Sequence, residues 1–497
     1  MAEDRNILIE DAEGNRYFPH TKDSNVFNAS GQSVASQLAD MSTDVVSRAI
    51  NVKYLFGTTL APAIGDGVTD DGAAIQAIID YAMGKGFDVF FPPGTYRSTT
   101  TLVIDNSESE HFNDSRKINL VGVGIGQTTI HYTGSGNALE LIGGKTGDLN
   151  SFMTFQQISN IRFLGDGASG SKGIYVDTCS FLHFQHVSSQ GFELGFDADD
   201  MDNSSFTKCI FHWNKYGIKM EERSPRNPLT STRPNNINFF DCQIGGNDNW
   251  GGMFVGGSTL NFFGGDVQGN GINGEDATKW GIQIIDAGVQ GGVACNFYGT
   301  FFESNVGVAD LWLYTQTDSG YGPTPCTYNV NGCTFNRTRD GWTSTYNILA
   351  GFDSDTFGQQ KLVVTGSAFK NFGGGVYTPT GVPHVVFSID PRDSKNFVFT
   401  NNVQSEDNEM VVEDVYMPIS TNVVGAFGEY KQMQSLVGES LSLPAGGMWE
   451  WAGYYVLNST GAMFHVGGNL AGIAAGGTQI LSGLASHLAV ATIRRIS

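Results

Sequence analysis

The sequence predicts an all-β fold, a right-handed parallel β-helix, and three observations point to it. The 497 residues include 65 Gly and 34 Phe, whereas charged residues make up only 16% of the chain. A short apolar phrase recurs at steps of 21–23 and 33–35 residues. No amphipathic helix pattern lies between the copies. Stacked coils bury together the apolar face that a single short strand cannot bury alone, so we expect a solenoid.

The repeated phrase is an Asn followed by two residues and a Gly, as in residues 261–264 and 296–299. The residue after this Asn is the reference position of a series that extends along the chain: Phe163, Phe184, Phe206, Phe239, Phe262, Phe297, Val330, Val364 and Val398. A second apolar strand follows each copy, beginning at Gly173 and Gly217 in two of them. Three cysteines lie three residues past their reference positions, so we expect them in one inward column: Cys209, Cys242 and Cys333.

Other patterns frame the solenoid, which we expect over residues 59–410. Residues 1–58 are polar and form a separate N-terminal segment. Residues 73–83 carry an apolar stripe and predict a helix that closes the open end of the β-helix, with Thr69 or Asp70 as its cap. The repeat stops after about residue 410, and residues 411–497 predict a small C-terminal β domain.

Composition excludes several classes of function. Fifty acidic against 28 basic residues leave a net charge of −22, which repels nucleic acid. No apolar run reaches the ~18 residues of a membrane helix, so no membrane insertion is expected. The first residues carry acids where a signal peptide needs cations. The six cysteines lack metal-binding spacing, so we expect buried free thiols and neither a metal nor a cofactor.

Residues 65–71 (GDGVTDD), 74–76 (AIQ) and 89–96 (VFFPPGTY) resemble the entry of pectate-lyase-like β-helix proteins. Within that superfamily, the three-part layout resembles a bacteriophage tailspike. The resemblance implies a homotrimer in the virion tail, made in the host cytoplasm and attached to a tail or baseplate protein through the N-terminal segment. Its C-terminal domain would trimerise the protein or bind glycan.

The same resemblance implies a substrate class, a bacterial capsule, O-antigen or exopolysaccharide. The Asn-Thr-Asp, Gly-His-Gly and Arg-Ile-Lys signatures of polygalacturonases are absent, which disfavours pectin. We therefore expect a depolymerase that hydrolyses the glycan. A lyase acting on a uronate-containing glycan and a non-enzymatic receptor-binding spike remain the alternatives.

Glycoside hydrolysis needs an acid for the leaving oxygen and a second carboxylate. Alternation along the strands predicts Asp241, Asp266 and Glu303 on the outer side of one sheet. This prediction assumes three matched sets of inward residues: Phe240, Cys242 and Ile244; Phe263, Gly265 and Val267; Tyr298, Thr300 and Phe302. One coil combined with two residues along the strand spans roughly 8 Å, which suits an inverting hydrolase. We predict Asp266 and Glu303 as the catalytic pair and Asp241 as a third member.

Aromatic side chains near these acids are expected to stack on sugar rings. The candidates lie in the same or the next coils: Trp250, Trp280, Trp312, Tyr314 and Trp342. A group of three arginines stands out in this acidic chain and is a candidate for binding acidic sugar substituents: Arg223, Arg226 and Arg233.

A rival acidic set lies at the second strand of three successive coils: Asp177, Asp197 and Glu221. Stacked like charges would raise a pKa there and supply the acid. Asp199, Asp200 and Asp202 are interpreted as part of a solvated loop. A lyase would instead need a base, for which the early coils offer three histidines with no assigned acid partner: His183, His186 and His212.

Overall fold

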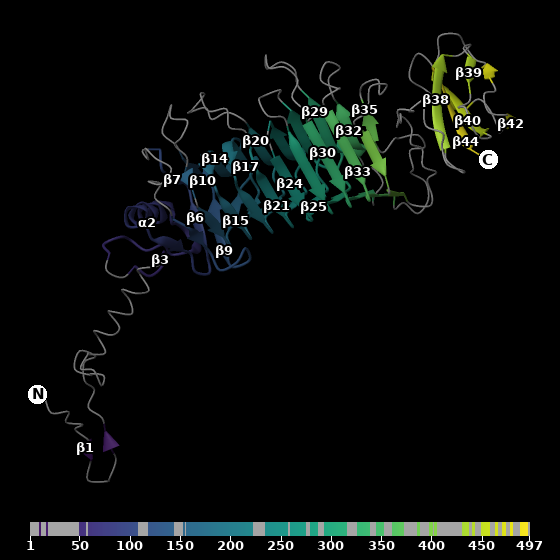
Figure 1. Cartoon of the computed structure of the whole chain (residues 1–497). Helices are drawn as coiled ribbons and strands as arrows, with labels where there is room; N and C mark the ends of the chain where they lie inside the picture. Colours follow the sequence, from purple (N-terminus) through teal and green to yellow (C-terminus); the bar gives the residue numbers. More distant parts are fainter. Residues whose placement is uncertain are drawn as a thin grey trace, which may run out of the picture.

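The chain folds into a parallel β-helix of three long sheets (Figure 1). The computed structural model describes residues 9–10, 16–17, 49–55, 58–107, 118–143, 153–154, 156–221, 234–256, 259–274, 279–286, 293–315, 326–337, 344–351, 360–371, 385–387, 397–400, 402–404, 430–436, 440–442, 449–457, 463–465, 470–473, 478–480 and 488–495. Within each coil the chain passes through sheet I, sheet II and sheet III in that order, and every neighbouring pair of strands in these sheets is parallel.

Sheet I contains β3 (Ala49–Asn51), β5 (Asp88–Phe90), β8 (Leu120–Val121), β12 (Gln157–Ser159), β15 (His183–Gln185), β18 (Ser205–Thr207), β21 (Ile237–Phe240), β24 (Thr259–Phe263), β27 (Ala294–Tyr298), β30 (Cys326–Asn331), β33 (Gln360–Thr365) and β36 (Phe397–Thr400). Sheet II contains β4 (Asp66–Asp70), β6 (Gly94–Ser98), β9 (Thr128–Tyr132), β13 (Arg162–Gly165), β16 (Ser188–Gln190), β19 (Ile210–His212), β22 (Gln243–Gly245), β25 (Asp266–Gln268), β28 (Phe301–Glu303), β31 (Thr334–Arg337), β34 (Ala368–Asn371) and β37 (Val403–Gln404).

Sheet III has the longer strands: β7 (Leu102–Asp105), β10 (Asn137–Ile142), β14 (Lys172–Ser180), β17 (Leu194–Asp202), β20 (Tyr216–Glu221), β23 (Trp250–Val255), β26 (Trp280–Asp286), β29 (Gly307–Thr315), β32 (Ser344–Gly351) and β35 (Val385–Phe387). The short strand β11 (Met153–Thr154) also pairs with β14. Nine-residue strands such as β14 and β17 give this sheet a broad outer face.

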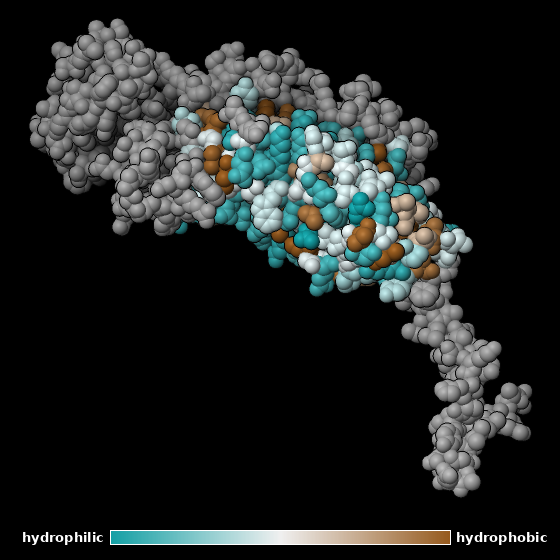
Figure 2. All heavy atoms as spheres, turned by 180° about the vertical axis from the view of Figure 1, so that it is seen from behind, coloured by the Kyte–Doolittle hydropathy of each residue, from teal (hydrophilic) through white to brown (hydrophobic). Residues whose placement is uncertain are grey.

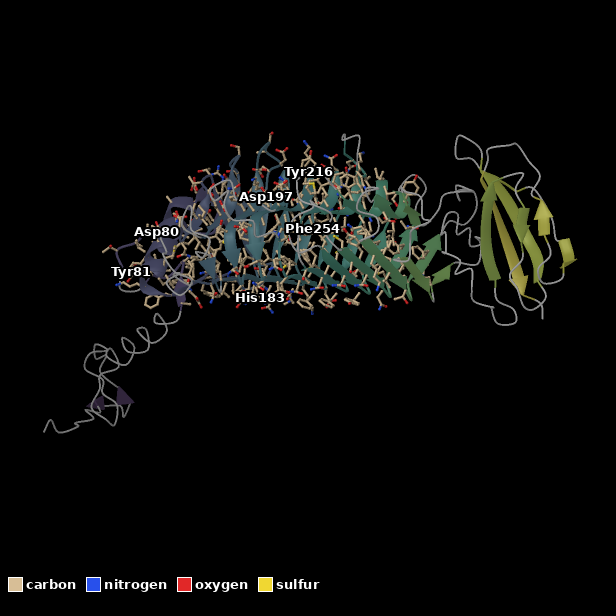
Figure 3. The ribbon with its side chains drawn as sticks, turned by 45° about the horizontal axis from the view of Figure 1, so that its top comes forward. Asp80, Tyr81, His183, Asp197, Tyr216 and Phe254 are labelled. Carbon is tan, nitrogen blue, oxygen red and sulfur yellow. The ribbon has the colours of Figure 1, made fainter. Side chains whose placement is uncertain are left out.

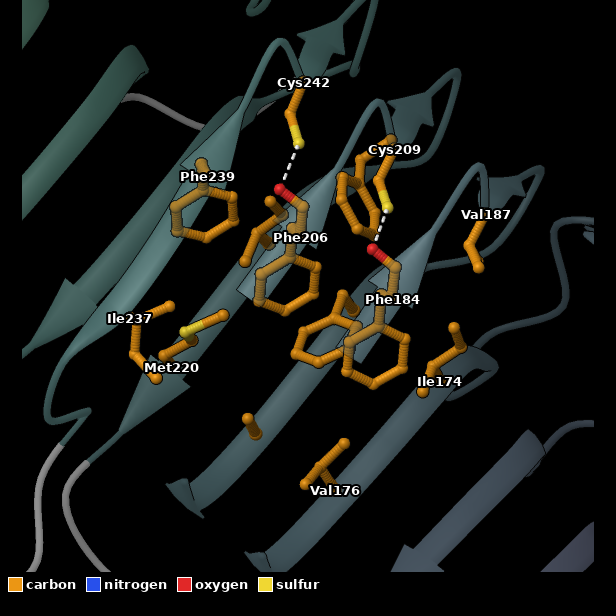
Figure 4. Packing of buried hydrophobic residues seen from close by; sticks show 14 of the residues in the cluster. Ile174, Val176, Phe184, Val187, Phe206, Cys209, Met220, Ile237, Phe239 and Cys242 are labelled. Carbon is orange, nitrogen blue, oxygen red and sulfur yellow. Dashed lines mark hydrogen bonds between the residues drawn. The ribbon is translucent and has the colours of Figure 1, made fainter. Parts of the chain in front are cut away.

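The core is a ladder of stacked aromatic rings that runs along sheet I. Phe184, Phe206, Phe239, Phe262 and Phe297 lie in register on successive coils, with ring centroids 4.6–4.9 Å apart. Figure 4 shows the first three of these rings facing one another inside the β-helix. The ladder continues in register through Val330 and Val364, as the repeat predicts.

Both ends of the predicted series need correction. Phe163 lies in β13 of sheet II, and Ile158 is the residue in register with Phe184. At the other end, Val398 pairs with Val363, so Phe399 rather than Val398 continues the ladder. Spacing counted along the chain misplaces these two positions because the turns and loops differ in length from coil to coil.

The cysteine column is confirmed. Cys209, Cys242 and Cys333 are buried, and each thiol donates a hydrogen bond to a carbonyl of sheet I one coil earlier. Figure 4 shows two of these bonds, to the carbonyls of Phe184 and Phe206. All six cysteines are free and buried, so they act as small core residues.

The turn between sheet I and sheet II changes which side chains face outward. The turn residue has a positive φ in successive coils, 49° at Asp241, 65° at Gly264 and 67° at Gly299. A residue in this left-handed conformation interrupts the alternation of a strand. Phe239 and Cys242 are therefore both buried although they lie three residues apart, and Phe240 is 39% exposed. The prediction that Phe240, Phe263 and Tyr298 face inward is therefore wrong.

Helix α2 (Gly72–Lys85) packs against the first strands and contributes Ile75, Ile78 and Ile79 to the core. It lies at the N-terminal end of the β-helix in Figure 1, where it closes that end as predicted. The N-cap residue is Asp71, not Thr69 or Asp70, which lie in β4. The Asp71 carboxylate instead accepts hydrogen bonds from the backbone N–H groups of Ile64 and Gly65, at 2.6 and 2.9 Å.

Further strands precede and follow the solenoid in the chain. Sheet I begins at β3, ten residues before the expected start at residue 59. An antiparallel pair, β1 (Ile9–Glu10) and β2 (Arg16–Tyr17), lies in the N-terminal segment. The C-terminal β unit has a five-stranded sheet of β38 (Tyr430–Leu436), β40 (Trp449–Leu457), β41 (Met463–His465), β42 (Leu470–Ile473) and β44 (Leu488–Arg495), with β39 (Ser440–Ser442) paired to β43 (Thr478–Ile480).

The face shown in Figure 2 is mostly hydrophilic, with apolar side chains scattered over it. No helix within the described residues has the length and apolar character needed to cross a membrane.

Candidate active site

Sheet III carries a column of three acidic residues on its outer face. Asp177, Asp199 and Glu221 lie directly opposite one another on β14, β17 and β20. Their neighbours Val176 and Ala198 are buried in the core, so alternation turns the acids outward. The predicted rival set had the right coils but the wrong middle residue, because Asp197 pairs with Tyr175 and Lys219 instead.

Asp199 also corrects the interpretation of this segment as a solvated loop. It lies inside β17 and is only 9% exposed, and Asp200 is fully buried. Strand β17 continues to Asp202 even though Asp200 has a φ of 60°. Burial raises the pKa of Asp202 to about 6. A run of acids in the sequence therefore does not indicate a solvated loop here.

The environment of Asp199 favours the protonated acid. Burial raises the pKa of Asp199 to about 6, and the negative charge of Asp197 adds to the effect. The phenol of Tyr175 donates a hydrogen bond of 2.8 Å to Asp199 Oδ2 and opposes this rise, because it stabilises the charged form. A carboxyl group with a pKa near 6 is suited to general acid catalysis near neutral pH.

Glu221, one coil further on, is in a different environment. Its side chain is 37% exposed, and Lys219 Nζ lies 2.9 Å from Glu221 Oε1. The ammonium group of Lys219 thus lies beside Glu221, whereas Asp199 is buried one coil earlier. Two neighbouring carboxyl groups whose environments differ in this way are a usual basis for acid and base or nucleophile roles.

Other polar groups surround the column. Lys172 Nζ lies 2.5 Å from Asp197 Oδ2 and 4.5 Å from the centre of the Tyr175 ring. Asp177 is fully buried; its Oδ1 accepts a hydrogen bond from Thr178, whereas its Oδ2 has no partner among the described residues. The acidic column therefore contains a buried acceptor atom to which no described residue donates.

An aromatic ladder borders the acids on the same sheet. Tyr216, Trp250 and Trp280 lie in register, and the two indole rings stack at 5.8 Å. Figure 3 shows Tyr216 and Asp197 on the same side of the β-helix. Trp250 and Trp280 are each only 8% exposed, so their ring faces cover one another and are not open to a sugar, contrary to the expectation.

Trp312 and Tyr314 offer a more accessible aromatic surface. The Trp312 ring stands at 77° to that of Trp280, and the side chain is half-buried. Its indole N–H has no hydrogen-bond partner among the described residues. Tyr314 is 37% exposed, and its ring lies 5.9 Å from that of Trp312. These two residues can contact a ligand along sheet III.

The predicted pair Asp266 and Glu303 lies on sheet II. Glu303 pairs with Gln268, so it lies one coil beyond Asp266 and two residues further along the strand. Val267 and Phe302 between them are buried, which turns both acids outward as the sequence predicts. Asp241 does not join them in the sheet, because it lies in the turn that precedes β22.

The described histidines have structural environments. His183 Nδ1 lies 2.7 Å from the hydroxyl of Ser205, and burial lowers the pKa of His183 and of His212. His183 lies on the opposite side of the β-helix from Asp197 (Figure 3). His186 lies in the turn between sheets I and II.

Several predicted ligand contacts lie outside the described residues: Trp342, Arg223, Arg226 and Arg233. Within the part of the chain that the structure describes, no group of three or more His, Cys, Asp or Glu residues is arranged to hold a metal ion.

The sequence contained a signal for the column that spacing from the Asn phrase missed. Asp177, Asp199 and Glu221 each come four residues after a Gly, at positions 173, 195 and 217. Tyr175, Asp197 and Lys219 come two residues after the same glycines. Aligning the coils on these glycines would have identified both outward columns of sheet III.

Comparison with known proteins supports the fold. Residues 61–273 match the family model described as rhamnogalacturonase A/epimerase, pectate lyase-like. This match agrees with the resemblance seen in the sequence. The comparison with curated proteins finds no match.

Among solved structures, the chain is similar to ORF18 of Geobacillus virus E2, at 18% identity and a TM-score of 0.50. That alignment covers 75% of this chain and spans 63% of the length of ORF18, and it shows a common fold. A tailspike protein of Acinetobacter phage vB_ApiP_P1 is also similar, at 13% identity and a TM-score of 0.46, covering 90% of this chain and 88% of that chain. A third similar structure is the A-module of the mannuronan C-5 epimerase AlgE6 from Azotobacter vinelandii, at 18% identity and a TM-score of 0.37, covering 71% and 99%.

Proposed function

We propose that this protein is a tailspike depolymerase that hydrolyses a bacterial surface polysaccharide on the outer face of sheet III. The observation that carries the proposal is Asp199, a carboxyl group with a pKa of about 6, directly opposite the ion-paired Glu221 on the next coil. Such a pair supplies the two functions that glycoside hydrolysis needs.

In the proposed reaction, Asp199 donates its proton to the glycosidic oxygen as the bond to the anomeric carbon breaks. Glu221 attacks that carbon and forms a glycosyl ester. Water then displaces Glu221 and gives its proton to Asp199, which restores both groups. Residues directly opposite on neighbouring parallel strands lie about 4.8 Å apart, close to the ~5–5.5 Å of retaining enzymes. We therefore expect the anomeric configuration to be retained.

Neighbouring residues complete the proposed site. Tyr175 positions Asp199 through its hydrogen bond. Trp312 and Tyr314 provide aromatic surface for the apolar face of a pyranose ring. Trp250 and Trp280 lie behind this surface and support it.

The assembly is part of the same proposal. We infer a homotrimer in the virion tail, with the N-terminal segment attached to a tail or baseplate protein and the C-terminal β unit used for trimerisation or glycan binding. Light scattering of the purified protein tests this directly, because a trimer has three times the 53.5 kDa of the chain. A monomer in solution would contradict it.

The activity is tested by incubating the protein with a panel of purified capsular, O-antigen and exopolysaccharide glycans. Hydrolysis predicts new reducing ends, products larger by one water, and retained anomers by proton NMR at early times. Products with an unsaturated uronate would instead identify a lyase. Stable glycan binding without any oligosaccharide release would identify a non-enzymatic spike.

A further inference from the structure

Sheet II presents a second pair of carboxyl groups with unequal environments, separate from the acids of sheet III. The register places Asp266 and Glu303 on neighbouring coils with an offset of two residues. One coil step of ~4.8 Å and two residues of ~3.3 Å each place their Cα atoms roughly 8 Å apart. A separation of this size between the carboxyl groups themselves would leave room for a water molecule.

The two carboxyl groups differ in what surrounds them. Burial raises the pKa of Asp266, and the charge of Glu303 raises it further. Glu303 instead accepts two amide hydrogen bonds, from Gln268 Nε2 at 2.6 Å and from Asn336 Nδ2 at 3.0 Å. Amide donors stabilise a charged carboxylate. Asp266 thus favours the acid form, whereas Glu303 is held by two amide donors.

An independent observation indicates that this pair faces a ligand. Asn336 is only 7% exposed, and its Oδ1 has no hydrogen-bond partner among the described residues, although its Nδ2 is bonded to Glu303. A buried amide oxygen without a partner costs free energy unless another group donates to it. A sugar hydroxyl bound beside Glu303 supplies such a donor.

Exposed aromatic side chains border the pair at the corner with sheet I. Phe240, Phe263 and Tyr298 form a stacked ladder on the outside of the β-helix, with centroids 5.1 and 5.4 Å apart. Phe240 and Tyr298 are each 39% exposed, and only Gly264 and Gly265 separate Phe263 from Asp266. The ring edges form an apolar wall that fits the C–H groups of a pyranose chain.

We propose that sheet II carries a second saccharide-cleaving site, in which Asp266 is the general acid and Glu303 the general base. Its ligand is a pyranoside chain, the class proposed for sheet III, so this inference rests on that function for the substrate only. Asp266 gives its proton to the leaving oxygen while the glycosidic bond breaks. Glu303 takes a proton from water, whose oxygen bonds to the anomeric carbon. One water is consumed, and solvent returns the proton from Glu303 to Asp266.

The roughly 8 Å spacing predicts inversion at sheet II, whereas the spacing at sheet III predicts retention. The two sites can therefore be told apart by their products. The test uses full-length protein with Asp199→Asn, which removes the proposed acid of sheet III, and with Asp266→Asn alone. Two double variants combine Asp199→Asn with Asp266→Asn or with Glu303→Gln. The control is Asp80→Asn, an exposed acid on helix α2 away from both faces (Figure 3).

We expect Asp199→Asn to keep a residual release of reducing ends whose anomers are inverted. Adding either sheet II substitution should lower that residual rate at least 100-fold, in line with the loss of an acid or base. A residual rate that the double variants retain would overturn the second site, and so would complete loss of cleavage in Asp199→Asn alone. If Asp199→Asn is fully active and Asp266→Asn is inactive, the sheet III assignment fails and the sheet II site stands.

Discussion

The phenol of Tyr175 donates a hydrogen bond of 2.8 Å to the carboxylate of Asp199 on the next coil of the β-helix. The two residues come from neighbouring strands of sheet III and are offset by two residues along the strand, since Tyr175 pairs with Asp197. This diagonal contact fixes the position of the Asp199 carboxyl group, which is buried on the outer side of sheet III. The behaviour of Asp199 therefore determines most of what we expect of the protein.

The rate of cleavage should fall as the pH rises, because Asp199 loses the proton that it donates. Because Asp199 has a pKa of about 6, the protonated fraction falls tenfold for each pH unit above that value. We expect the alkaline side of the kcat/KM profile to have its midpoint near pH 6. Initial rates of reducing-end release between pH 4 and 9 measure this. An alkaline midpoint above pH 8 would argue against Asp199 as the acid.

Removing the Tyr175 hydroxyl should move that midpoint upward. The hydrogen bond favours the charged form of Asp199, so Tyr175→Phe raises the pKa of Asp199. A net hydrogen-bond contribution of about 0.5–1.5 kcal/mol corresponds to a shift of up to about one pH unit. Tyr81→Phe, on helix α2, is the matched control. A midpoint that stays in place or moves down would contradict a positioning role for Tyr175.

The pH also affects folding through Asp199. Its pKa is about 6 in the folded protein against 3.8 for an ordinary Asp, so the folded state binds the proton more tightly. Stability is therefore lost as the pH rises from about 4 to about 6 and is constant above that range. Asp199→Asn removes this loss. We therefore compare the free energy of unfolding of the variant with that of wild type. The difference should shift in favour of the variant by up to about 3 kcal/mol as the pH rises from 4 to 8.

Thermal unfolding midpoints of both proteins, measured by calorimetry at pH 4 and pH 8, check this expectation. Asp80→Asn serves as the control because its carboxyl group is exposed on helix α2. Equal changes with pH in wild type and Asp199→Asn would show that Asp199 titrates as an ordinary surface acid.

Two adjacent phenylalanines should respond differently to truncation. Phe239 is 1% exposed and stacks between Phe206 and Phe262, so Phe239→Ala should cost about 3–5 kcal/mol. Phe240 lies on the outside at 39% exposure, and Phe240→Ala should cost less than about 1.5 kcal/mol. Denaturant midpoints of the two variants measure the difference. A larger loss of stability in Phe240→Ala than in Phe239→Ala would show that Phe240, and not Phe239, faces the core.

The fold could be predicted from the sequence because the same core positions recur in successive coils. Phe206, Phe239 and Phe262 occupy the same position in successive coils, and a recurring apolar phrase of this kind is typical of a solenoid. The direction in which a side chain points could be predicted only within a single strand. At Asp241 a left-handed turn interrupts the alternation, and a non-glycine residue there carries no sequence mark of its positive φ.

The candidate site shows the same limit. The offset of Asp266 and Glu303 follows from counting within β25 and β28, and the sequence predicts it. The burial of Asp199 does not follow from its neighbours in the sequence, Ala198 and Asp200, because burial depends on residues far apart in the chain. Local acidity therefore suggests a loop where the structure has a buried strand.

The rate of reducing-end release by Asp199→Asn and by Glu221→Gln, each compared with Asp80→Asn on a glycan that the wild type cleaves, tests the central claim most directly. Our account predicts that each sheet III variant loses at least 100-fold in rate and loses the products with retained anomers, whereas Asp80→Asn matches wild type. Wild-type rates with retained anomers in both sheet III variants would contradict it.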